Sequence, residues 1–358
     1  MAGVNLSGQK VIAAMSGGVD SSVAAALLKQ AGAEVVGVFL CLGRAGAADS
    51  VSRGCCSADD AADARRVAEK LGIELHVIDA GAAFEGIIDE FAAEYARGHT
   101  PNPCIRCNAE VKFARLMKLA DALGARYVAS GHYARIVSRG GRQAVARARA
   151  VEKDQSYALF AVNGEWLGRV VLPIGELDGK AEVRRIAGAS GLAVHDKPDS
   201  QEICFVDGDD YSVILAERAP EALRPGRIVD AEGRELGRHE GYGRFTIGQR
   251  RGLGVAGGVP LYVTAIDPET ATVTLGPREA LMRTHLAASR AVWQQPVGES
   301  FRAAVQIRST HRGAAATVRR RGEGRFEVEF DAPVSAITAG QAAVVYDGEV
   351  VLGGGWID

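Results

Sequence analysis

The stretch KVIAAMSGGVDSSVAAALLKQ, residues 10–30, carries the clearest structural signal in this 358-residue chain. Residues 10–15 form a short apolar run that predicts a buried strand, and the Ala- and Leu-rich residues 22–30 predict a helix. Between them, residues 16–22 read SGGVDSS, whose two glycines are typical of a tight turn from a strand into a helix. A second apolar run at residues 34–42 completes a predicted beta-alpha-beta unit.

The same alternation of helices and strands continues through the first third of the chain. Helices are predicted at residues 58–71, 84–97 and 109–123, and strands at residues 73–79 and 126–130. Such alternation is typical of a doubly wound parallel sheet with right-handed crossovers and helices on both faces. The sequence therefore predicts an α/β fold for its N-terminal part.

The pattern changes beyond about residue 207. Short runs such as GRIVD, PLYVTAID, FRAAVQI and AAVVYDG alternate apolar with polar residues between turns, which is typical of antiparallel strands. We expect three domains, because the chain is longer than one hydrophobic core usually serves. They are an α/β catalytic domain at 1–206, a small central β-rich linking domain at 207–277, and a C-terminal antiparallel β-barrel at 278–358.

Composition limits the classes of function. The formal net charge is -2, so any binding of nucleic acid must depend on local basic patches. The N-terminus does not read as a secretory signal, and no segment is long and apolar enough to span a bilayer. The six cysteines, at positions 41, 55, 56, 104, 107 and 204, indicate chemistry or metal binding in a reducing compartment. We expect a cytoplasmic enzyme with no membrane partner.

The glycine-rich turn predicts a phosphate site. Glycines let the backbone approach a ligand, and the first N–H groups of the following helix are available to bind an anion. The turn lacks both the Walker A and the G-x-G-x-x-G patterns, and its bland interpretation is a turn with Asp20 and Ser21 as helix caps. We favour a pyrophosphate site, because Ser16, both glycines and these two residues all follow the first strand.

SGGVDSS resembles the PP-loop of ATP pyrophosphatases, which cleave ATP between its alpha and beta phosphates to adenylate a substrate oxygen. Further segments follow it in the order found in the bacterial tRNA-specific 2-thiouridylase (MnmA) family and cover nearly the whole chain: TPNPCIRCNAEVKF, SGHYARI, EKDQSYAL, DSQEICFV, GRFTIGQRRGLGV and GEVVLGGGWI. The resemblance implies an enzyme that uses ATP and Mg²⁺ to replace O2 of the wobble uridine of tRNA by sulfur.

The resemblance also implies site residues and partners. Nucleotide contacts would come from Ala14, Met15, Ser16, Gly17, Gly18, Val19, Asp20, Ser21, Leu40 and Gly131. Contacts with tRNA would come from Asn102, Pro103 and Cys104 at the target base, and from Lys153, Asp154, Gln155, Arg308 and Ser309 elsewhere. Family members often carry Arg-Tyr at the last two positions. The acceptors would be the tRNAs for Lys, Glu and Gln, with a cysteine desulfurase or a sulfur-relay protein as donor.

The cysteines depart from the family pattern. The best-known members read Asp-x-x-Cys, whereas this chain carries Cys104 at the position of the acid. By resemblance, Cys107 matches the cysteine that acts on the activated base, and Cys204 matches the distant cysteine that carries a persulfide. A thiol does not simply replace a carboxylate, because their unperturbed pKa values differ by about 4.5 units.

Several interpretations of these thiols are open. We favour Cys104, Cys107 and Cys204 as ligands of a 4Fe-4S cluster with one iron not ligated by protein, which could hold a sulfide. Alternatively, Cys107 and Cys204 follow the persulfide route, with Cys104 a bystander or a resolving thiol. A zinc site would need a fourth ligand from the pair at 55–56 or from His99. The bland interpretation makes Cys104 a small buried residue.

Local basic clusters offer the positive charge that tRNA would need. They are GQRRG with Arg250 and Arg251, QIRSTHR with Arg308 and Arg312, and RRRGEGR with the arginines at 319–321. Each is otherwise an ordinary solvated face. The Gly- and Ala-rich residues 43–54 predict a mobile lid. Two other functions compete: a PP-loop ligase or amidotransferase acting on a small metabolite, and a non-catalytic tRNA-binding protein.

Overall fold

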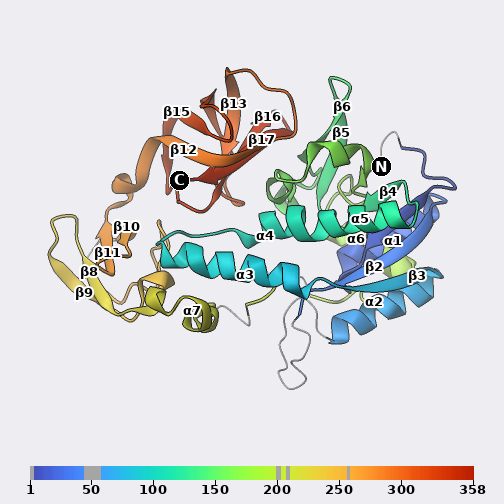
Figure 1. The fold of residues 1–358 in the computed structure, drawn as a ribbon, viewed down its shortest axis with the longest axis horizontal. Coiled ribbons are helices and arrows are strands. Elements are labelled where there is room, and N and C mark those ends of the chain that lie inside the picture. The colour runs from blue at the N-terminus through green and yellow to red at the C-terminus, as the bar shows by residue number, and fades with distance from the viewer. Residues whose placement is uncertain (1–3, 44–57, 199–202, 207–209, 256–258) are drawn as a thin grey trace.

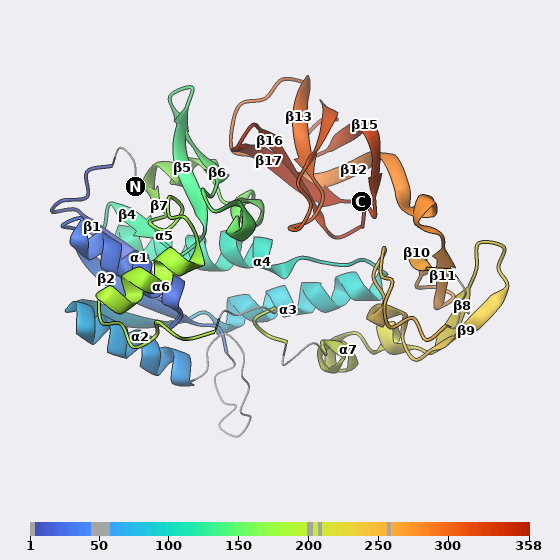
Figure 2. The same cartoon turned by 180° about the vertical axis from the view of Figure 1, so that it is seen from behind.

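The computed structural model describes residues 4–43, 58–198, 203–206, 210–255 and 259–358 (Figures 1 and 2). All but the first residue of the predicted lid, together with Cys55 and Cys56, lies outside the described residues. The long helix α3 (Gly81–Ala96) runs from the N-terminal sheet to the central β-rich part, and the C-terminal barrel lies beside it (Figure 1). Among the described residues, no helix combines the length and apolar character needed to cross a membrane.

The N-terminal sheet has five strands. They are β1 (Lys10–Ala14), β2 (Glu34–Cys41), β3 (Glu74–Asp79), β4 (Tyr127–Ala129) and β7 (Val170–Val171). Their order is β3-β2-β1-β4-β7, and every neighbouring pair is parallel. This order reverses direction at β1, so the first strand-to-helix turn lies where ligands of doubly wound sheets bind.

Helices cover both faces of this sheet, as predicted. The α-helices are α1 (Val19–Gln30), α2 (Ala58–Leu71), α3, α4 (Pro103–Arg106), α5 (Ala114–Ala122) and α6 (Lys180–Ala189). Between α4 and α5 lies the π-helix η1 (Cys107–Phe113), and three short 3-10 helices follow: η2 (Val151–Lys153), η3 (Ser156–Leu159) and η4 (Gly164–Arg169). Val11 packs in the cluster that contains Leu28 of α1, whereas the next residue, Ile12, packs with Leu116 of α5. This period-2 alternation is why both faces are buried.

Two details of the N-terminal half differ from the sequence prediction. Helix α1 begins at Val19 with Gly18 as its N-cap, so the last four of the seven residues of SGGVDSS are helical rather than turn. The chain also forms a hairpin of β5 (Ala134–Arg139) and β6 (Arg142–Arg147), which the predicted α/β alternation did not include. This hairpin leaves the parallel sheet and reaches toward the barrel (Figure 2).

The central part is a small mixed sheet with short helices. Its strands are β8 (Gly226–Val229), β9 (Glu235–His239), β10 (Tyr262–Asp267) and β11 (Thr272–Gly276), in the order β10-β11-β8-β9. Its helices are α7 (Ser212–Arg218), η5 (Pro220–Leu223) and η6 (Tyr242–Arg244). Phe91 and Tyr95 of α3 share an apolar cluster with Leu215 and Tyr242, so α3 belongs to two cores. Helix α7 precedes the first of the predicted strands, which is β8.

The C-terminal part is a closed antiparallel barrel, which confirms the predicted fold class. After η7 (Arg278–Leu281) come β12 (Met282–Trp293), β13 (Ser300–Gln306), β14 (Ala314–Arg320), β15 (Phe326–Ser335), β16 (Ala342–Asp347) and β17 (Val350–Ile357). The barrel closes because β12 pairs with both β15 and β17. The hairpin of the N-terminal half joins it where Val350 pairs with Ala146.

Candidate active site

The predicted phosphate loop lies at the carboxyl end of β1. The hydroxyl of Ser21 accepts a hydrogen bond from the backbone N–H of Ser16 (3.1 Å) and donates one to the carbonyl of Gly18 (3.1 Å). Gly17 has a φ of +74°, and a Cβ there would collide with the backbone of Asp60. Glycine is therefore required at this position, and the loop is shaped by its own residues and by α2.

Asp20, in the first turn of α1, is held by residues distant in sequence. Its carboxylate accepts a hydrogen bond from the hydroxyl of Tyr133 (2.9 Å). It also accepts from the ammonium group of Lys180, with both oxygens at 2.9 Å. These contacts tie α1 to the segment after β4 and to the start of α6, so the carboxylate is fixed beside the loop.

Lys197 clamps the loop from a third direction. Its ammonium group donates to the carbonyl of Gly17 (3.1 Å) and to the carboxylates of Asp60 and Asp63 (2.6 Å each). Burial alone would lower the pKa of Lys197, but the two carboxylates outweigh it, so the pKa is raised. The clamp is therefore fully charged at neutral pH, and it is lost only when strongly alkaline pH passes the raised pKa.

We expect Lys197→Met to weaken ATP binding about tenfold, because one charged donor to the loop is lost and the positive charge that Asp60 and Asp63 share with the loop is removed. Calorimetric titration with a non-hydrolysable ATP analogue measures this. Lys118→Met, on the exposed face of α5, is the matched control. Equal affinities of the two variants would show that the clamp does not act on the nucleotide.

A pocket of about 200 Å³ opens over the loop. It is lined by seven of the predicted nucleotide residues: Ala14, Met15, Ser16, Asp20, Ser21, Leu40 and Gly131. The other three do not line it: Gly17 and Gly18 form the turn, and Val19 is the first residue of α1. The pocket also contains Gln155, which was predicted to contact tRNA rather than the nucleotide, and residues that were not predicted as site residues, among them Leu42, Lys112, Phe113 and His132. Phe113 and Leu40 give it an apolar wall, and Lys112 adds a positive charge.

His132 presents a neutral ring to this pocket. Its Nδ1 lies 2.8 Å from the hydroxyl of Ser130, and the ring stacks on Phe113 at a centroid distance of 6.1 Å. Burial lowers the pKa of His132 to about 3, and the charge of Lys112 acts in the same direction. His132 is therefore uncharged at neutral pH and suits a packing role beside an aromatic base better than acid catalysis.

The Cys-x-x-Cys segment begins a helix with an irregular second turn. The side chain of Asn102 caps this helix by accepting a hydrogen bond from the backbone N–H of Cys104 (3.2 Å), and Pro103 occupies the first helical position. At Cys107 the helix widens into the π-helix η1, a distortion that is frequent at functional sites. Cys104 is exposed, whereas Cys107 is only 4% exposed.

The structure brings Cys107 and Cys204 together. Both pack in one apolar cluster with Phe84 and Ile87 of α3, although they are far apart in sequence. Leu42 belongs to this cluster and also lines the nucleotide pocket. The cluster that contains both cysteines therefore adjoins the pocket. Cys104 is not part of the cluster.

The three-cysteine ligand set is not assembled. Within the part of the chain that the structure describes, no three side chains of His, Cys, Asp or Glu gather closely enough to hold a metal ion. Cys104 is exposed, while Cys107 is buried among apolar side chains. This arrangement does not fit a 4Fe-4S cluster or a zinc site that uses Cys104, and no chemical step is derived through either.

The predicted tRNA residues around position 154 have different roles. The carboxylate of Asp154 is engaged by the backbone N–H groups of Ala148 and Ser156, the hydroxyl of Ser156 and the guanidinium of Arg147. Gln155 lines the nucleotide pocket and accepts a hydrogen bond from the backbone N–H of Tyr133 (2.9 Å). Asp154 therefore shapes the turn, and Gln155 lies between the pocket and the exposed surface.

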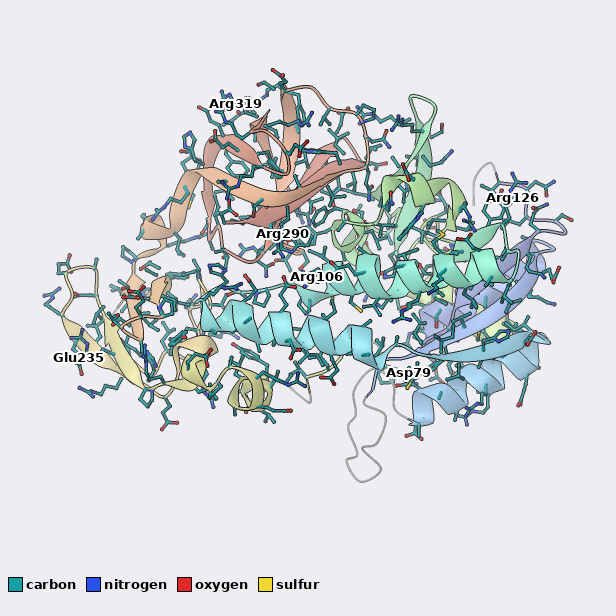
Figure 3. The ribbon with its side chains drawn as sticks, viewed as in Figure 1. Asp79, Arg106, Arg126, Glu235, Arg290 and Arg319 are labelled. Atoms are coloured by element: carbon teal, nitrogen blue, oxygen red, sulfur yellow. The ribbon has the colours of Figure 1, made fainter. Side chains whose placement is uncertain are left out.

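Among the described residues, some arginines of the basic clusters are neutralised by ion pairs with glutamates, and others are not. Arg319 and Arg321 form ion pairs with Glu329 and Glu327, and Arg319 lies at the outer edge of the barrel (Figure 3). In contrast, Arg250, Arg278 and Arg308 line one cavity of about 300 Å³ between the central sheet and the barrel. None of these three forms an ion pair with any described residue. Ser309 is exposed, and its carbonyl accepts a hydrogen bond from Gln306 (3.1 Å).

Comparison with known proteins places the whole chain in one family. Three family models match it: the tRNA methyl transferase HUP domain at residues 9–208, its PRC-barrel domain at 213–277, and the aminomethyltransferase beta-barrel domain at 283–357. The tRNA-specific 2-thiouridylase MnmA of Roseiflexus castenholzii is 48% identical over 97% of this chain and 99% of its own length. The proteins of the same name from Chloroflexus aurantiacus (47%; 97% and 98%) and Carboxydothermus hydrogenoformans (46%; 98% and 98%) are similarly related. With this identity over nearly its full length, and with a phosphate loop and a cysteine pair at one pocket, the chain belongs to the tRNA-specific 2-thiouridylase MnmA family.

Proposed function

We propose that this chain catalyses the ATP-dependent 2-thiolation of the wobble uridine of tRNA and releases AMP and pyrophosphate. One observation carries the proposal: the pocket over the phosphate loop and the Cys107–Cys204 cluster share Leu42 as a common wall. A nucleotide in the pocket and a sulfur atom on the cysteines would then reach the same uracil ring. Family membership supports the same reaction.

The first step is adenylation of the uridine oxygen. The N–H groups at the start of α1 would bind the pyrophosphate, and the apolar wall with Leu40 and Phe113 would hold the adenine. Asp20 is a carboxylate of the pocket that would share Mg²⁺ with the phosphates. When bound, Mg²⁺ stabilises the charge that develops on the departing pyrophosphate. The uridine O2 attacks the alpha phosphorus, and the bond to pyrophosphate breaks.

The second step transfers sulfur along the persulfide route, which the cysteine arrangement favours. The terminal sulfur of a Cys204 persulfide attacks C2 of the adenylated uracil, and AMP leaves with the former O2. The Cys107 thiolate then attacks the Sγ of Cys204, which releases the 2-thiouridine sulfur and leaves a disulfide between the two cysteines. A dithiol reductant must reduce this disulfide before the next turnover. The sulfur would come from a cysteine desulfurase, directly or through a relay protein.

We assign different tasks to the three parts of the chain. Residues 1–206 would bind ATP and catalyse both steps of the reaction. Residues 207–277 would link the other two parts, and residues 278–358 would contact tRNA. Asn102 and Pro103 stand at the start of the cysteine helix, where the target base would enter, beside the exposed Cys104. Lys153 and Gln155 would contact the tRNA near the pocket mouth, with Asp154 holding their turn. Arg308 and Ser309 would do so from the barrel.

The test of the proposed function is a reconstitution. The protein is incubated with ATP, Mg²⁺, a sulfide or persulfide donor and unmodified tRNA for Lys, Glu or Gln, and the digested nucleosides are analysed. We expect 2-thiouridine and one AMP for each thiolated tRNA. If no 2-thiouridine forms with air excluded or admitted, the proposal fails. AMP formation without tRNA, driven by an amino acid, would instead support a ligase.

The three-arginine cavity leads to a prediction about tRNA affinity. We expect Arg250→Gln and Arg308→Gln each to weaken tRNA binding and to reduce the slope of log K against log salt by about 1, because each guanidinium would neutralise one phosphate. Filter binding at several salt concentrations measures both quantities. Arg238→Gln, an exposed arginine paired with Glu235 on β9, is the control. An unchanged salt slope in the first two variants would remove this cavity from the tRNA interface.

A further inference from the structure

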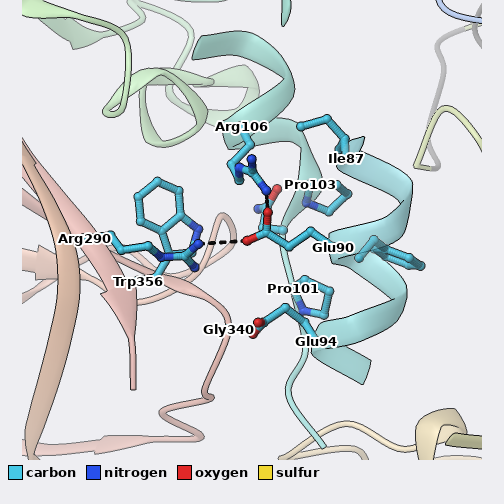
Figure 4. Close-up of a pocket in the computed structure, with 11 residues that line it drawn as sticks. Ile87, Glu90, Glu94, Pro101, Pro103, Arg106, Arg290, Gly340 and Trp356 are labelled. Atoms are coloured by element: carbon cyan, nitrogen blue, oxygen red, sulfur yellow. Dashed lines mark hydrogen bonds and ion pairs between the residues drawn. The ribbon is translucent and has the colours of Figure 1, made fainter. Parts of the chain in front are cut away.

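One glutamate joins the sulfur-transfer helix to the barrel. Glu90 on α3 is paired with Arg106, which is the last residue of α4 and directly precedes Cys107. The other carboxylate oxygen of Glu90 accepts a hydrogen bond from Arg290 of β12 (2.8 Å). Figure 4 shows Glu90 between the two guanidinium groups, and Figure 3 shows them at the junction of the barrel with α4. Glu90 and Arg106 are 27% and 24% exposed, so solvent screens this contact only in part.

Arg106 is oriented by more than one partner. It also forms a bidentate contact with Glu110 of η1, with distances of 2.8 Å and 2.6 Å. Two parallel hydrogen bonds fix the plane of the guanidinium group as well as its position. Because Arg106 contacts both Glu90 and Glu110, the position of Glu90 affects the orientation of the two helical turns that flank Cys107.

The barrel adopts an unusual backbone conformation to present Arg290. This residue has a φ of +50°, which is uncommon for a non-glycine residue, and the pairing of β12 with β17 shifts register between Ser289 and Val292. Such an irregularity re-aims a side chain out of the regular alternation of a strand. The guanidinium group then lies 4.7 Å from the ring centroid of Trp356, which supports it from the barrel side.

The barrel also holds the other end of the catalytic loop. The backbone N–H of Thr100 donates to the carbonyl of Ala339 (2.9 Å), and the side chain of Gln341 donates to the carbonyl of Thr100 (2.7 Å). Between them, Gly340 has a φ of +86° and passes so close to the loop that a Cβ would lie 3.2 Å from the backbone of Thr100. Pro101 and Pro103 have no backbone N–H, so the loop can form few backbone hydrogen bonds of its own.

We propose that Glu90 is a positioning residue that, with Arg290 and Arg106, lets the barrel set the position of Cys107. The inference rests on the proposed function, in which Cys107 completes sulfur transfer. It gives the barrel a second role in addition to contact with tRNA. The barrel holds residues on both sides of Asn102 and Pro103: Thr100 directly, and Arg106 through Glu90. We call the contact of Glu90 with Arg290 and Arg106 the brace. Its loss would leave the nucleotide pocket intact and misplace the thiol that completes sulfur transfer.

The experiment separates adenylation from sulfur transfer. Glu90→Gln and Arg290→Gln are assayed in a single turnover with ATP, unmodified tRNA and a persulfide donor, and both pyrophosphate and released 2-thiouridine are measured. We expect the rate of pyrophosphate release to stay within about twofold of wild type and the rate of 2-thiouridine release to fall about tenfold, because small misplacements of a reacting group have large effects on rate. The double variant should lose little more than either single variant, since the residues act as a unit. Asp331→Asn, which breaks the exposed pair with Arg302 inside the barrel, is the control.

A second measurement does not depend on activity. Trypsin cleavage after Arg106 places Cys104 in the peptide GHTPNPCIR and Cys107 in CNAEVK, so brief iodoacetamide labelling of the native protein reports on each thiol separately. We expect the labelling of Cys107 relative to Cys104 to rise severalfold in both brace variants and not in Asp331→Asn. Wild-type ratios in both assays would overturn the inference. Absence of 2-thiouridine from the wild-type protein would overturn the proposed function, while the labelling ratio would still test the brace.

Discussion

Cys204→Ser is expected to abolish thiolation, with a fall of about a thousandfold or more, because the hydroxyl cannot carry a persulfide. Adenylation uses the phosphate loop and not this thiol, so pyrophosphate should still be released from ATP in the presence of tRNA. The measurement is 2-thiouridine and pyrophosphate from the same reaction. The predicted pattern is a loss of the first with retention of the second.

The other cysteines make this prediction specific. Cys107→Ser should stop the reaction one step later and trap tRNA on Cys204 through a persulfide adduct, which a thiol reductant releases. Cys104 lies outside the apolar cluster that contains Cys107 and Cys204. We therefore expect Cys104→Ser to keep most of its activity. A loss as complete as that of Cys204→Ser would contradict the persulfide route and favour a chemistry that needs all three thiols.

Gly131→Ala is expected to weaken ATP binding about a hundredfold and to reduce AMP formation accordingly, since the N–H groups at the start of α1 are the proposed anion site. A Cβ at this position would lie 2.6 Å from the backbone nitrogen of Ser21 and 2.8 Å from the carbonyl carbon of Asp20. Neither atom belongs to a flexible side chain, so the first turn of α1 must move. Titration with a non-hydrolysable ATP analogue measures the loss.

Gly86→Ala is the matched control for this substitution. Gly86 is exposed on α3, and a Cβ there would meet no atom within 4 Å. The change should stabilise the protein slightly, because alanine favours a helix over glycine by about 1 kcal/mol. Unchanged ATP affinity in Gly131→Ala, together with a folded protein, would show that the segment after β4 does not press against the phosphate loop.

The α/β architecture and the phosphate loop could be predicted because their signals are local. Residues 10–30 contain a strand, a glycine pair and a helix in order, and the alternation that follows needs no knowledge of distant contacts. The strands beyond β8 could also be predicted, because apolar and polar residues alternate along them with a period of two. The residues of the pocket that belong to this loop followed from the motif.

Other features could not be predicted from the sequence, because they arise from contacts between residues that are distant in it. Lys180 and Lys197 hold the loop from more than 150 residues away, and no motif marks either of them. The shift into a π-helix at Cys107 and the positive φ of Arg290 depend on packing that propensity does not describe. The hairpin β5–β6 joins a barrel strand more than 200 residues later.

The order of residues was thus enough to predict a parallel sheet with a phosphate loop, a β-rich C-terminal half and three candidate thiols. Folding in three dimensions sorted those thiols: Cys107 and Cys204 entered one apolar cluster, and Cys104 was left exposed. In a regular helix, residues three apart lie on the same face, so the Cys-x-x-Cys spacing alone does not distinguish the two thiols. What distinguishes them is tertiary packing, which buries Cys107 among residues distant in sequence and leaves Cys104 exposed.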